Sequence, residues 1–273
     1  MVHAFGEACA AGDHLRFSML GPVTAWFGTR EISLGPPQQR AVLTTLLCQN
    51  GSYVSVDELI DAIWSDGLTE TAEKTLRTYI YRLRQIFKEH VGDDPPVIVS
   101  MNRGYATEVA EPAIDVHAFF SAVEDARQAR RAQDLGTVVA RAREGLGLWR
   151  GREAMTGVPG GFAERVRIRL YEARLSAFEM LLSAQLSLGI VADTATDELA
   201  ALVAENPLDE RFRSLFMIAL VRGDRRAEAL FTYHDAQRAL REGLGIDPGE
   251  ELRKTYAHIL RGDLGSYSAS RGP

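Results

Sequence analysis

TAEKTLRTYIYRLRQIFK, residues 71–88, repeats its apolar side chains with the period of an α-helix. At about 100° per residue, one arc of roughly 120° collects the apolar positions, which are Leu76, Tyr79, Ile80, Leu83, Ile86 and Phe87. The opposite side carries the polar and basic residues, which are Lys74, Arg77, Thr78, Tyr81, Arg82, Arg84, Gln85 and Lys88. This separation predicts a helix that packs through its apolar face and leaves a cationic face for a partner.

Two shorter helices are predicted before this one. Pro36-Pro37 opens the first, which we expect to run to about Asn50 and to end at Gly51, because proline is tolerated in a first turn. Ser55-Val56-Asp57-Glu58 is a capping-box pattern, in which the Ser hydroxyl and the Glu carboxylate each satisfy a backbone amide. It predicts a second helix that ends near Trp64.

Short β-elements are predicted on both sides of the three helices. Residues 97–99 and 105–107 form a hairpin pattern joined by Ser100–Gly104. Residues 15–34 alternate apolar and polar side chains in short runs, broken at two Gly-containing turns, which is typical of an antiparallel meander. Three helices followed by a hairpin are the order of a winged helix-turn-helix.

In such a fold the third helix would enter the major groove of duplex DNA, where Arg pairs with guanine and Thr or Tyr meets thymine methyls or phosphates. The candidate contacts on this helix are Lys74, Arg77, Thr78, Tyr81, Arg82, Arg84 and Lys88. Asn102 and Arg103 at the hairpin tip would reach the adjacent minor groove or its phosphates. Gln38 and Arg40 would meet phosphates at the start of the first helix. An ordinary solvated surface is the alternative for each set.

The second half of the chain has a helical apolar period from residue 114 onward. Gly189 and Gly223 each follow an apolar helical segment and lie 34 residues apart, the tetratricopeptide spacing. A last helix is predicted to start with Asp247 as its cap and Pro248 in its first turn. The predicted fold class is therefore mainly α, with an N-terminal winged helix-turn-helix containing small antiparallel β-elements and then an all-α, tetratricopeptide-like domain. The predicted domains are a disordered tail at 1–14, the winged helix at 15–110, the helical domain at 111–262 and a flexible tail at 263–273.

The charge balance restricts the position of any DNA-binding surface. The 273 residues include 31 Lys and Arg against 37 Asp and Glu, a net charge of −6, and affinity for duplex DNA comes largely from basic groups. Residues 71–90 nevertheless hold five Lys and Arg against two Glu, so positive charge is concentrated on the third helix. No apolar run of about 18 residues and no export signal is present. We expect a cytoplasmic, nucleoid-associated protein.

The sequence shows no pattern typical of an enzyme or a metal site. The six histidines are scattered without an i, i+4 pair, and the chain has neither CxxC nor a nucleophile or phosphate-binding motif. Paired carboxylates such as Asp57 and Asp61 lie on helices expected to be exposed. We therefore expect no catalytic residues, no metal and no cofactor.

The whole arrangement resembles the Streptomyces antibiotic regulatory protein family, in which an OmpR-type winged helix precedes a bacterial transcriptional activation domain. The matching stretches are LGPPQQRAVLTTLL (34–47), VSVDELIDAIW (54–64), KTLRTYIYRLRQIF (74–87), RGY (103–105), LWRG (148–151), ENPLDERFRSLFMIALVRGDRRAEAL (205–230) and LREGLGIDPGEELR (240–253). The likeness covers about residues 15–262. Two departures are the wing tip Met101-Asn102-Arg103, where relatives often carry prolines, and the absence of a following nucleotide-binding domain, which argues against control by ATP.

The resemblance implies a pathway-specific activator of secondary-metabolite, antibiotic-type gene clusters. It implies homodimers on tandem direct repeats of double-stranded DNA near a promoter, and recruitment of RNA polymerase including its sigma factor. In this family the loop before the recognition helix contacts polymerase, and by position its candidates are Asp66 and Glu70. The alternative is a helical-repeat scaffold or sensor that binds a peptide or a small metabolite, with the N-terminal domain as a docking module.

Overall fold

The computed structural model describes residues 14–64, 70–92, 96–190 and 193–262, which form two compact units. The first unit contains the described residues through Asp125 together with Arg143–Leu175. The second contains Ala126–Ala142 together with the described residues from Ser176 onward. The predicted tails, apart from His14, lie outside the described residues.

The first unit opens with a three-stranded antiparallel sheet in the order β1-β2-β3, formed by Leu15–Ser18, Thr24–Phe27 and Arg30–Ile32. Gly21 and Gly28 have positive φ angles of 149° and 57° in the two connections, as the sequence pattern predicts. Phe17 lies opposite Ala25 in the register, and both are buried. The predicted meander is confirmed.

Helices α1 (Pro37–Cys48) and α2 (Val56–Ile63) follow, joined through the short strand β4 (Val54–Ser55). The capping box at the start of α2 is present, because the Ser55 hydroxyl accepts from the Glu58 amide and the Glu58 carboxylate accepts from the Ser55 amide. Strand β4 was not predicted, since two residues are too few to show a period.

Helix α3 (Glu70–Val91) contains the predicted 71–88 stretch and runs one residue further at its start and three at its end. Its side chains Leu76, Ile80, Leu83 and Phe87 are buried, as the apolar arc predicts. The Phe87 ring meets the edge of Phe17 from β1 at 5.7 Å and 83°. The apolar arc therefore anchors α3 to the N-terminal sheet.

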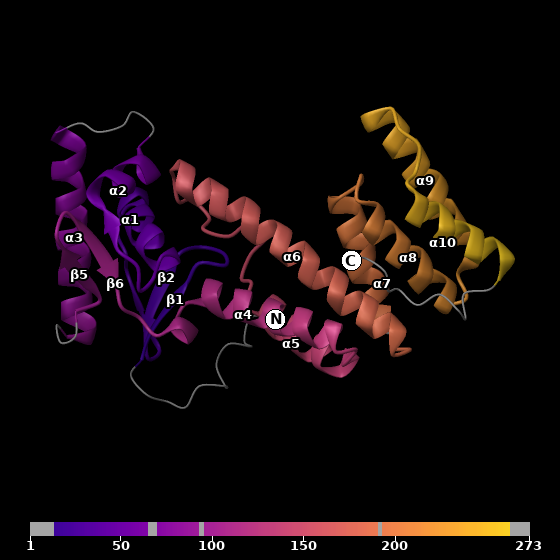
Figure 1. Ribbon diagram of the computed structural model, residues 1–273, viewed down its shortest axis with the longest axis horizontal. Coiled ribbons are helices and arrows are strands. Elements are labelled where there is room, and N and C mark those ends of the chain that lie inside the picture. Colours follow the sequence, from indigo (N-terminus) through magenta and orange to yellow (C-terminus); the bar gives the residue numbers. More distant parts are fainter. Residues whose placement is uncertain (1–13, 65–69, 93–95, 191–192, 263–273) are drawn as a thin grey trace. The chain divides into compact units, whose positions relative to one another are not determined.

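The wing is the hairpin of β5 (Ile98–Met101) and β6 (Gly104–Thr107), in a second sheet ordered β4-β6-β5. Its connection is shorter than the predicted Ser100–Gly104, because only Asn102 and Arg103 lie between the strands. Asn102 has a φ of 45°, a left-handed conformation that Asn tolerates better than most residues. Figure 1 shows α3 beside this hairpin.

Within the described residues, no β-strand follows Thr107, and the regular elements from there on are helices. The elements are the 3₁₀ turn η1 (Glu111–Ala113), α4 (Asp115–Arg131), α5 (Leu135–Gly147), α6 (Gly161–Ser187), α7 (Asp193–Glu205), α8 (Glu210–Arg222), α9 (Arg226–Leu244) and α10 (Glu250–Arg261). The predicted fold class, a winged helix followed by a helical domain, is confirmed. No described helix has both the length and the apolar character of a membrane span.

The second unit is built on α7–α10, with α8 packed against α7, α9 and α10. One core cluster consists of Met217, Leu220, Ala229, Tyr233, Ala236, Leu252 and Ile259. The predicted start of the last helix is wrong: α10 begins at Glu250, and its N-cap Gly249 makes no side-chain capping bond. The Glu210 carboxylate accepts from the Gly249 amide at 2.7 Å instead, while Asp247 pairs with Arg241.

Candidate nucleic-acid interface

The outer face of α3 is exposed along the predicted length. Lys74, Arg77, Thr78, Tyr81, Arg82, Gln85 and Lys88 are all exposed. Tyr81 is 63% exposed, although it is one of the largest side chains of the helix. The structure thus gathers six of the seven predicted α3 contacts on one solvent-facing surface, and only Arg84 differs.

Arg77 and Thr78 of this face each make a contact within α3. Arg77 donates to the Glu73 carboxylate at 2.6 Å, one turn earlier, with 67% of the Arg77 side chain still exposed. The Thr78 hydroxyl donates to the carbonyl oxygen of Lys74 at 2.9 Å. An exposed i, i+4 ion pair contributes little to stability, so Arg77 can exchange Glu73 for a phosphate or a guanine edge at small cost.

Arg84 is half-buried and contacts the wing. Its Nε donates to the Ile98 carbonyl oxygen at 3.1 Å, its terminal nitrogen donates to the Ser100 hydroxyl oxygen at 2.8 Å, and its guanidinium lies 5.8 Å from the centre of the Tyr105 ring. The Nε and one terminal nitrogen of this cation therefore join α3 to the hairpin.

The wing tip presents Asn102 and Arg103, both exposed. Behind the tip, the Arg103 carbonyl oxygen accepts from the Val56 amide at 2.9 Å, which ties the turn to the start of α2. Gly104 is required here, because a Cβ at this position would collide with the Val54 carbonyl oxygen and the Tyr53 ring. The backbone of the tip is held in place while its two side chains stay accessible.

The predicted contacts of the first helix lie in different environments. Gln38 is exposed, and its Oε1 accepts from the Tyr79 hydroxyl at 3.0 Å. Arg40 is half-buried, and its Nε has no hydrogen-bond partner among the described residues. Gln38 therefore lies beside α3 through Tyr79, whereas Arg40 is partly withdrawn from the surface.

Tyr79 has a role that the periodicity of α3 does not predict. It belongs to the apolar arc, but its ring stacks on Trp64 at 6.4 Å and 7° while its hydroxyl donates to Gln38. A tyrosine at the margin of an apolar arc is the available signal, since its hydroxyl needs a polar partner. Tyr79 of α3 thus joins this helix to the end of α2 and the start of α1.

The predicted polymerase contacts are only partly within the described residues. Asp66 lies outside them, and Glu70 is the first residue of α3.

Within the described residues, no group of three or more His, Cys, Asp or Glu is arranged to hold a metal ion. The chemistry of this surface is thus that of arginine, lysine, hydroxyl and amide groups, which suits hydrogen bonding to base edges and phosphates.

Two family models match the chain. The one described as "Transcriptional regulatory protein, C terminal" matches residues 29–107, which contain α1 to the wing. The one described as "Bacterial transcriptional activator domain" matches residues 114–260, which is more than half of the chain. The predicted boundary between residues 110 and 111 stays a prediction.

Known proteins resemble the chain along most of its length. The regulatory protein AfsR of Streptomyces griseus is 44% identical over 254 residues, which are 93% of this chain and 25% of AfsR. The regulatory protein DnrI of Streptomyces peucetius is 32% identical over 257 residues, which are 92% of this chain and 94% of DnrI. The chain thus spans about a quarter of AfsR and nearly all of DnrI.

Among solved structures, that of Mycobacterium tuberculosis EmbR in complex with a low-affinity phosphopeptide is similar. Its TM-score is 0.84 at 27% identity, and the match covers 91% of this chain and 65% of that one. The two domain models, the relatives and this structure agree with one another. The chain belongs to the Streptomyces antibiotic regulatory protein family, a family of transcriptional regulators and not of enzymes.

Proposed function

We propose that this regulator binds duplex DNA with α3 in the major groove and the wing beside it, and that it activates transcription from tandem direct repeats. One observation carries the proposal: a helix anchored by Leu76, Ile80, Leu83 and Phe87 exposes cationic and polar side chains on its other side. A cationic helix face of this size matches the width of the major groove.

We propose different roles in DNA binding for different side chains of this surface. Arg77 and Arg82 are exposed near the middle of α3 and are proposed to read base edges, where Arg pairs with guanine O6 and N7. Thr78 and Tyr81 are proposed to meet thymine methyls or phosphates. The other proposed contacts are phosphates or the adjacent minor groove, reached by Lys74, Lys88, Asn102, Arg103, Gln38 and Arg40. Arg84 is proposed to act through the wing.

The partners follow from the family and extend the proposal. A homodimer would place two α3 helices on two direct repeats, as tandem half-sites require. Asp66 and Glu70 are proposed to contact RNA polymerase, including its sigma factor, next to the DNA-bound helix. The regulated genes are proposed to be a secondary-metabolite, antibiotic-type cluster, and the protein is proposed to act at the nucleoid in the cytoplasm.

A mobility-shift titration of the full chain on a directly repeated promoter site tests the DNA contacts. We expect Arg82→Ala to lose about 1–3 kcal/mol of discrimination against one changed base pair, since one bidentate base contact is removed. Arg130→Ala, an exposed arginine of α4, is the matched control and should bind as wild type. An absence of duplex binding by the wild-type protein at low salt would end the proposal.

The salt dependence separates the two kinds of contact. Lys74→Ala and Lys88→Ala should weaken binding to all sequences alike and lower the slope of log affinity against log salt by about one unit each. Arg82→Ala should change the ranking of sequences instead. Equal loss on all sequences for Arg82→Ala would move this residue to the phosphate set.

A second candidate function is a helical-repeat scaffold, favoured by exposed apolar side chains of the second unit. Phe231 on α9 is 69% exposed, and large exposed apolar groups mark interaction sites. To test this candidate, promoter activation and DNA affinity are measured for Phe231→Ser in the full chain. Loss of activation with unchanged affinity would support it, and wild-type values of both would exclude Phe231 as its docking site.

A further inference from the structure

The β1–β2 turn of the winged helix is bonded to a segment far along the chain, which we call the strap and define as residues 150–158. Three backbone amides of the strap donate to carbonyl oxygens of the turn, in the pairs Arg150 to Leu20 at 2.8 Å, Met155 to Met19 at 2.7 Å and Thr156 to Gly21 at 3.0 Å. The Arg150 guanidinium adds bonds to the Pro22 carbonyl oxygen and the Thr24 hydroxyl. The turn and the strap are thus paired over several residues.

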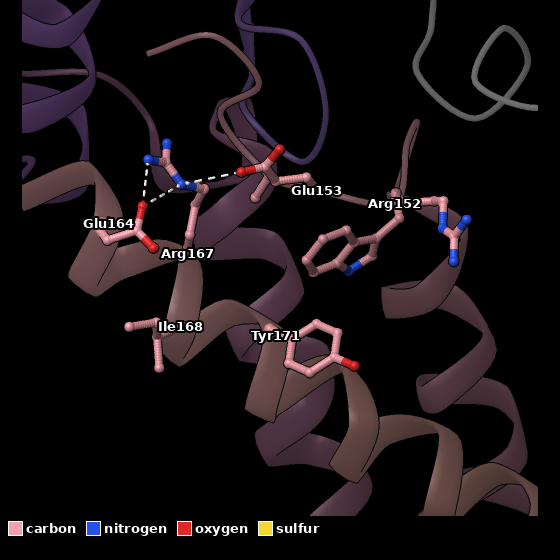
Figure 2. A pocket seen from close by; sticks show the side chains of 8 residues that line it. Arg152, Glu153, Glu164, Arg167, Ile168 and Tyr171 are labelled. Carbon is pink, nitrogen blue, oxygen red and sulfur yellow. Dashed lines mark hydrogen bonds and ion pairs between the residues drawn. The ribbon is translucent and has the colours of Figure 1, made fainter. Parts of the chain in front are cut away.

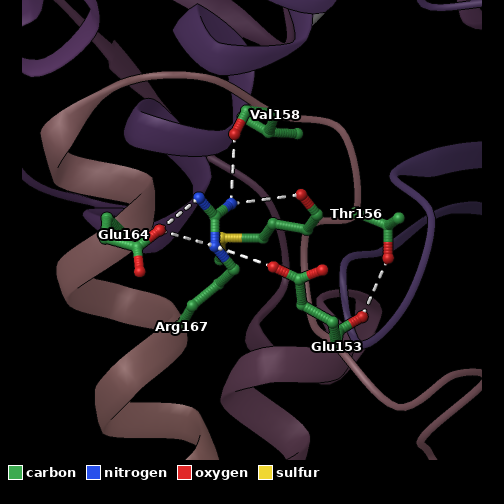
Figure 3. A network of polar contacts seen from close by, with 6 residues as sticks. Glu153, Thr156, Val158, Glu164 and Arg167 are labelled. Atoms are coloured by element: carbon green, nitrogen blue, oxygen red, sulfur yellow. Dashed lines mark hydrogen bonds and ion pairs between the residues drawn. The ribbon is translucent and has the colours of Figure 1, made fainter.

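The opposite side of the strap is held by α6. Arg167 is only 16% exposed, and it donates to the carbonyl oxygens of Val158 at 3.0 Å and Met155 at 3.4 Å. Its charge is balanced by Glu164 at 2.6 Å and Glu153 at 3.3 Å (Figure 3). One guanidinium therefore satisfies two strap carbonyls and two carboxylates, a use of several donors that Lys cannot reproduce.

Asp115, the first residue of α4, holds the same turn directly. Its carboxylate accepts from the Met19 amide at 2.7 and 2.8 Å and from the Leu20 amide at 3.0 Å, and it is 8% exposed. A buried carboxylate is costly unless it is hydrogen-bonded, so these bonds are needed for the fold. The turn is fixed both by α4 and by the strap.

The restrained turn is connected to α3 through strand β1. The turn follows β1, whose Phe17 meets Phe87 of α3 edge-on. The residue before α6 also lies against α2. Gly160 is so close to α2 that a Cβ at this position would collide with the Ala62 carbonyl oxygen. Both the sheet behind α3 and the helix before it therefore contact residues from the activator domain.

The strap and α6 also border a hollow. It has a volume of about 320 Å³ and is lined by Trp149, Arg152, Glu153, Ala154, Glu164, Arg167, Ile168 and Tyr171 (Figure 2). Ile168 and Tyr171 remain exposed beside it. Arg174 of α6 also donates to the carbonyl oxygens of Gly151 and Arg152, and the strap side chains Ala154, Met155 and Val158 are buried. The hydrogen bonds of Arg167 therefore act together with these contacts to keep the strap on α6.

We propose that the strap joins the winged helix and the first helices of the activator domain into one rigid body, and that Arg167 is a positioning residue for α3. Consequently, the position of α3 on DNA sets the direction in which α4 and the first part of α6 leave the DNA-binding domain. The proposal deepens the proposed function, and it rests on that function only where DNA affinity is measured.

Hydrogen exchange of the full chain with Arg167→Met tests the coupling. The substitution keeps an unbranched stem of four atoms beyond Cα and removes the guanidinium donors. We expect exchange to accelerate about 10- to 100-fold in the strap, as loss of hydrogen bonds to a charged donor predicts. Faster exchange should also reach β1 and the second half of α3, and the affinity for duplex DNA should fall.

Arg165→Met is the matched control, because Arg165 is exposed on the same helix, and it should exchange as wild type. Acceleration confined to residues 150–158, with β1 and α3 protected as in wild type, would overturn the proposal. If Arg167→Met does not fold, Arg167→Lys is measured instead. Hydrogen exchange should then accelerate in the same regions, by a smaller factor. Failure of the wild type to bind DNA would reject the proposed function, while the exchange pattern would still decide the coupling.

Discussion

The Arg84 guanidinium in α3 donates to the Ser100 hydroxyl oxygen in β5 at 2.8 Å, so α3 and the wing are joined by a cation that the sequence pattern predicts to contact DNA. The same side chain reaches the Ile98 carbonyl oxygen. A residue on the interface helix thus orients a second element of the interface. Its effect on binding should differ from that of its exposed neighbours.

Arg84→Met should lower duplex affinity by about 1–3 kcal/mol on all sequences alike, because the wing loses its fixed direction while base readout by α3 is kept. Mobility-shift titrations over a set of single-base operator changes measure both effects. Arg130→Ala, at an exposed position of α4 outside this face, serves as the control. A relaxed preference at a single base pair would instead assign Arg84 to direct readout.

Ser55→Ala should destabilise the protein by about 0.5–2 kcal/mol, because the first turn of α2 loses the side-chain acceptor for the Glu58 amide. Urea unfolding followed by circular dichroism measures the change. Ser52→Ala is the matched control, since Ser52 is exposed and lies before β4. Equal unfolding midpoints for the two variants would show that the capping box does not stabilise α2.

Asp115 should make stability depend on pH. Burial raises its pKa to about 6 from an ordinary value of 3.8, so the folded protein binds this proton more tightly than the unfolded chain. Between about pH 4 and 6 its contribution to the free energy of unfolding therefore falls as pH rises, by about 2–3 kcal/mol in total, and stays low above pH 6.

Asp115→Asn removes this titration and retains one oxygen acceptor for the turn amides. The free energy of unfolding of wild type minus that of Asp115→Asn, from urea titrations at several pH values, should decrease from pH 4 to pH 6. All other carboxylates cancel in this difference. A flat or rising difference over that interval would contradict the raised pKa.

The Cys48 thiol should be inert in the folded protein. Burial raises its pKa to about 12, and only the thiolate attacks a disulfide reagent. In a Cys9→Ser background, reaction with an aromatic disulfide at pH 8 should be about 1000-fold slower in buffer than in denaturant. Comparable rates in the two conditions would place Cys48 in a solvent-accessible thiolate-forming site.

Local patterns accounted for most of the winged helix. The capping box of α2, the apolar arc of α3 and the glycines of the meander depend on neighbours only a few residues away, and each lies where its pattern predicts. Likewise, the exposure of Arg77 and Arg82 follows from the 3.6-residue period alone. Boundaries were less accurate, because the ends of α3 and the length of the wing turn depend on packing and strand pairing.

The amino-acid sequence by itself determined the order of the three helices and the wing, the two faces of α3 and the family to which the chain belongs. Tertiary structure alone decided that Arg84 orients the wing, that Tyr79 joins three helices, and that the β1–β2 turn is held by Asp115 and a strap more than 120 residues away. The reason is physical. Periodicity and capping act between near neighbours, whereas hydrogen bonds between distant segments form only after those segments have been packed side by side.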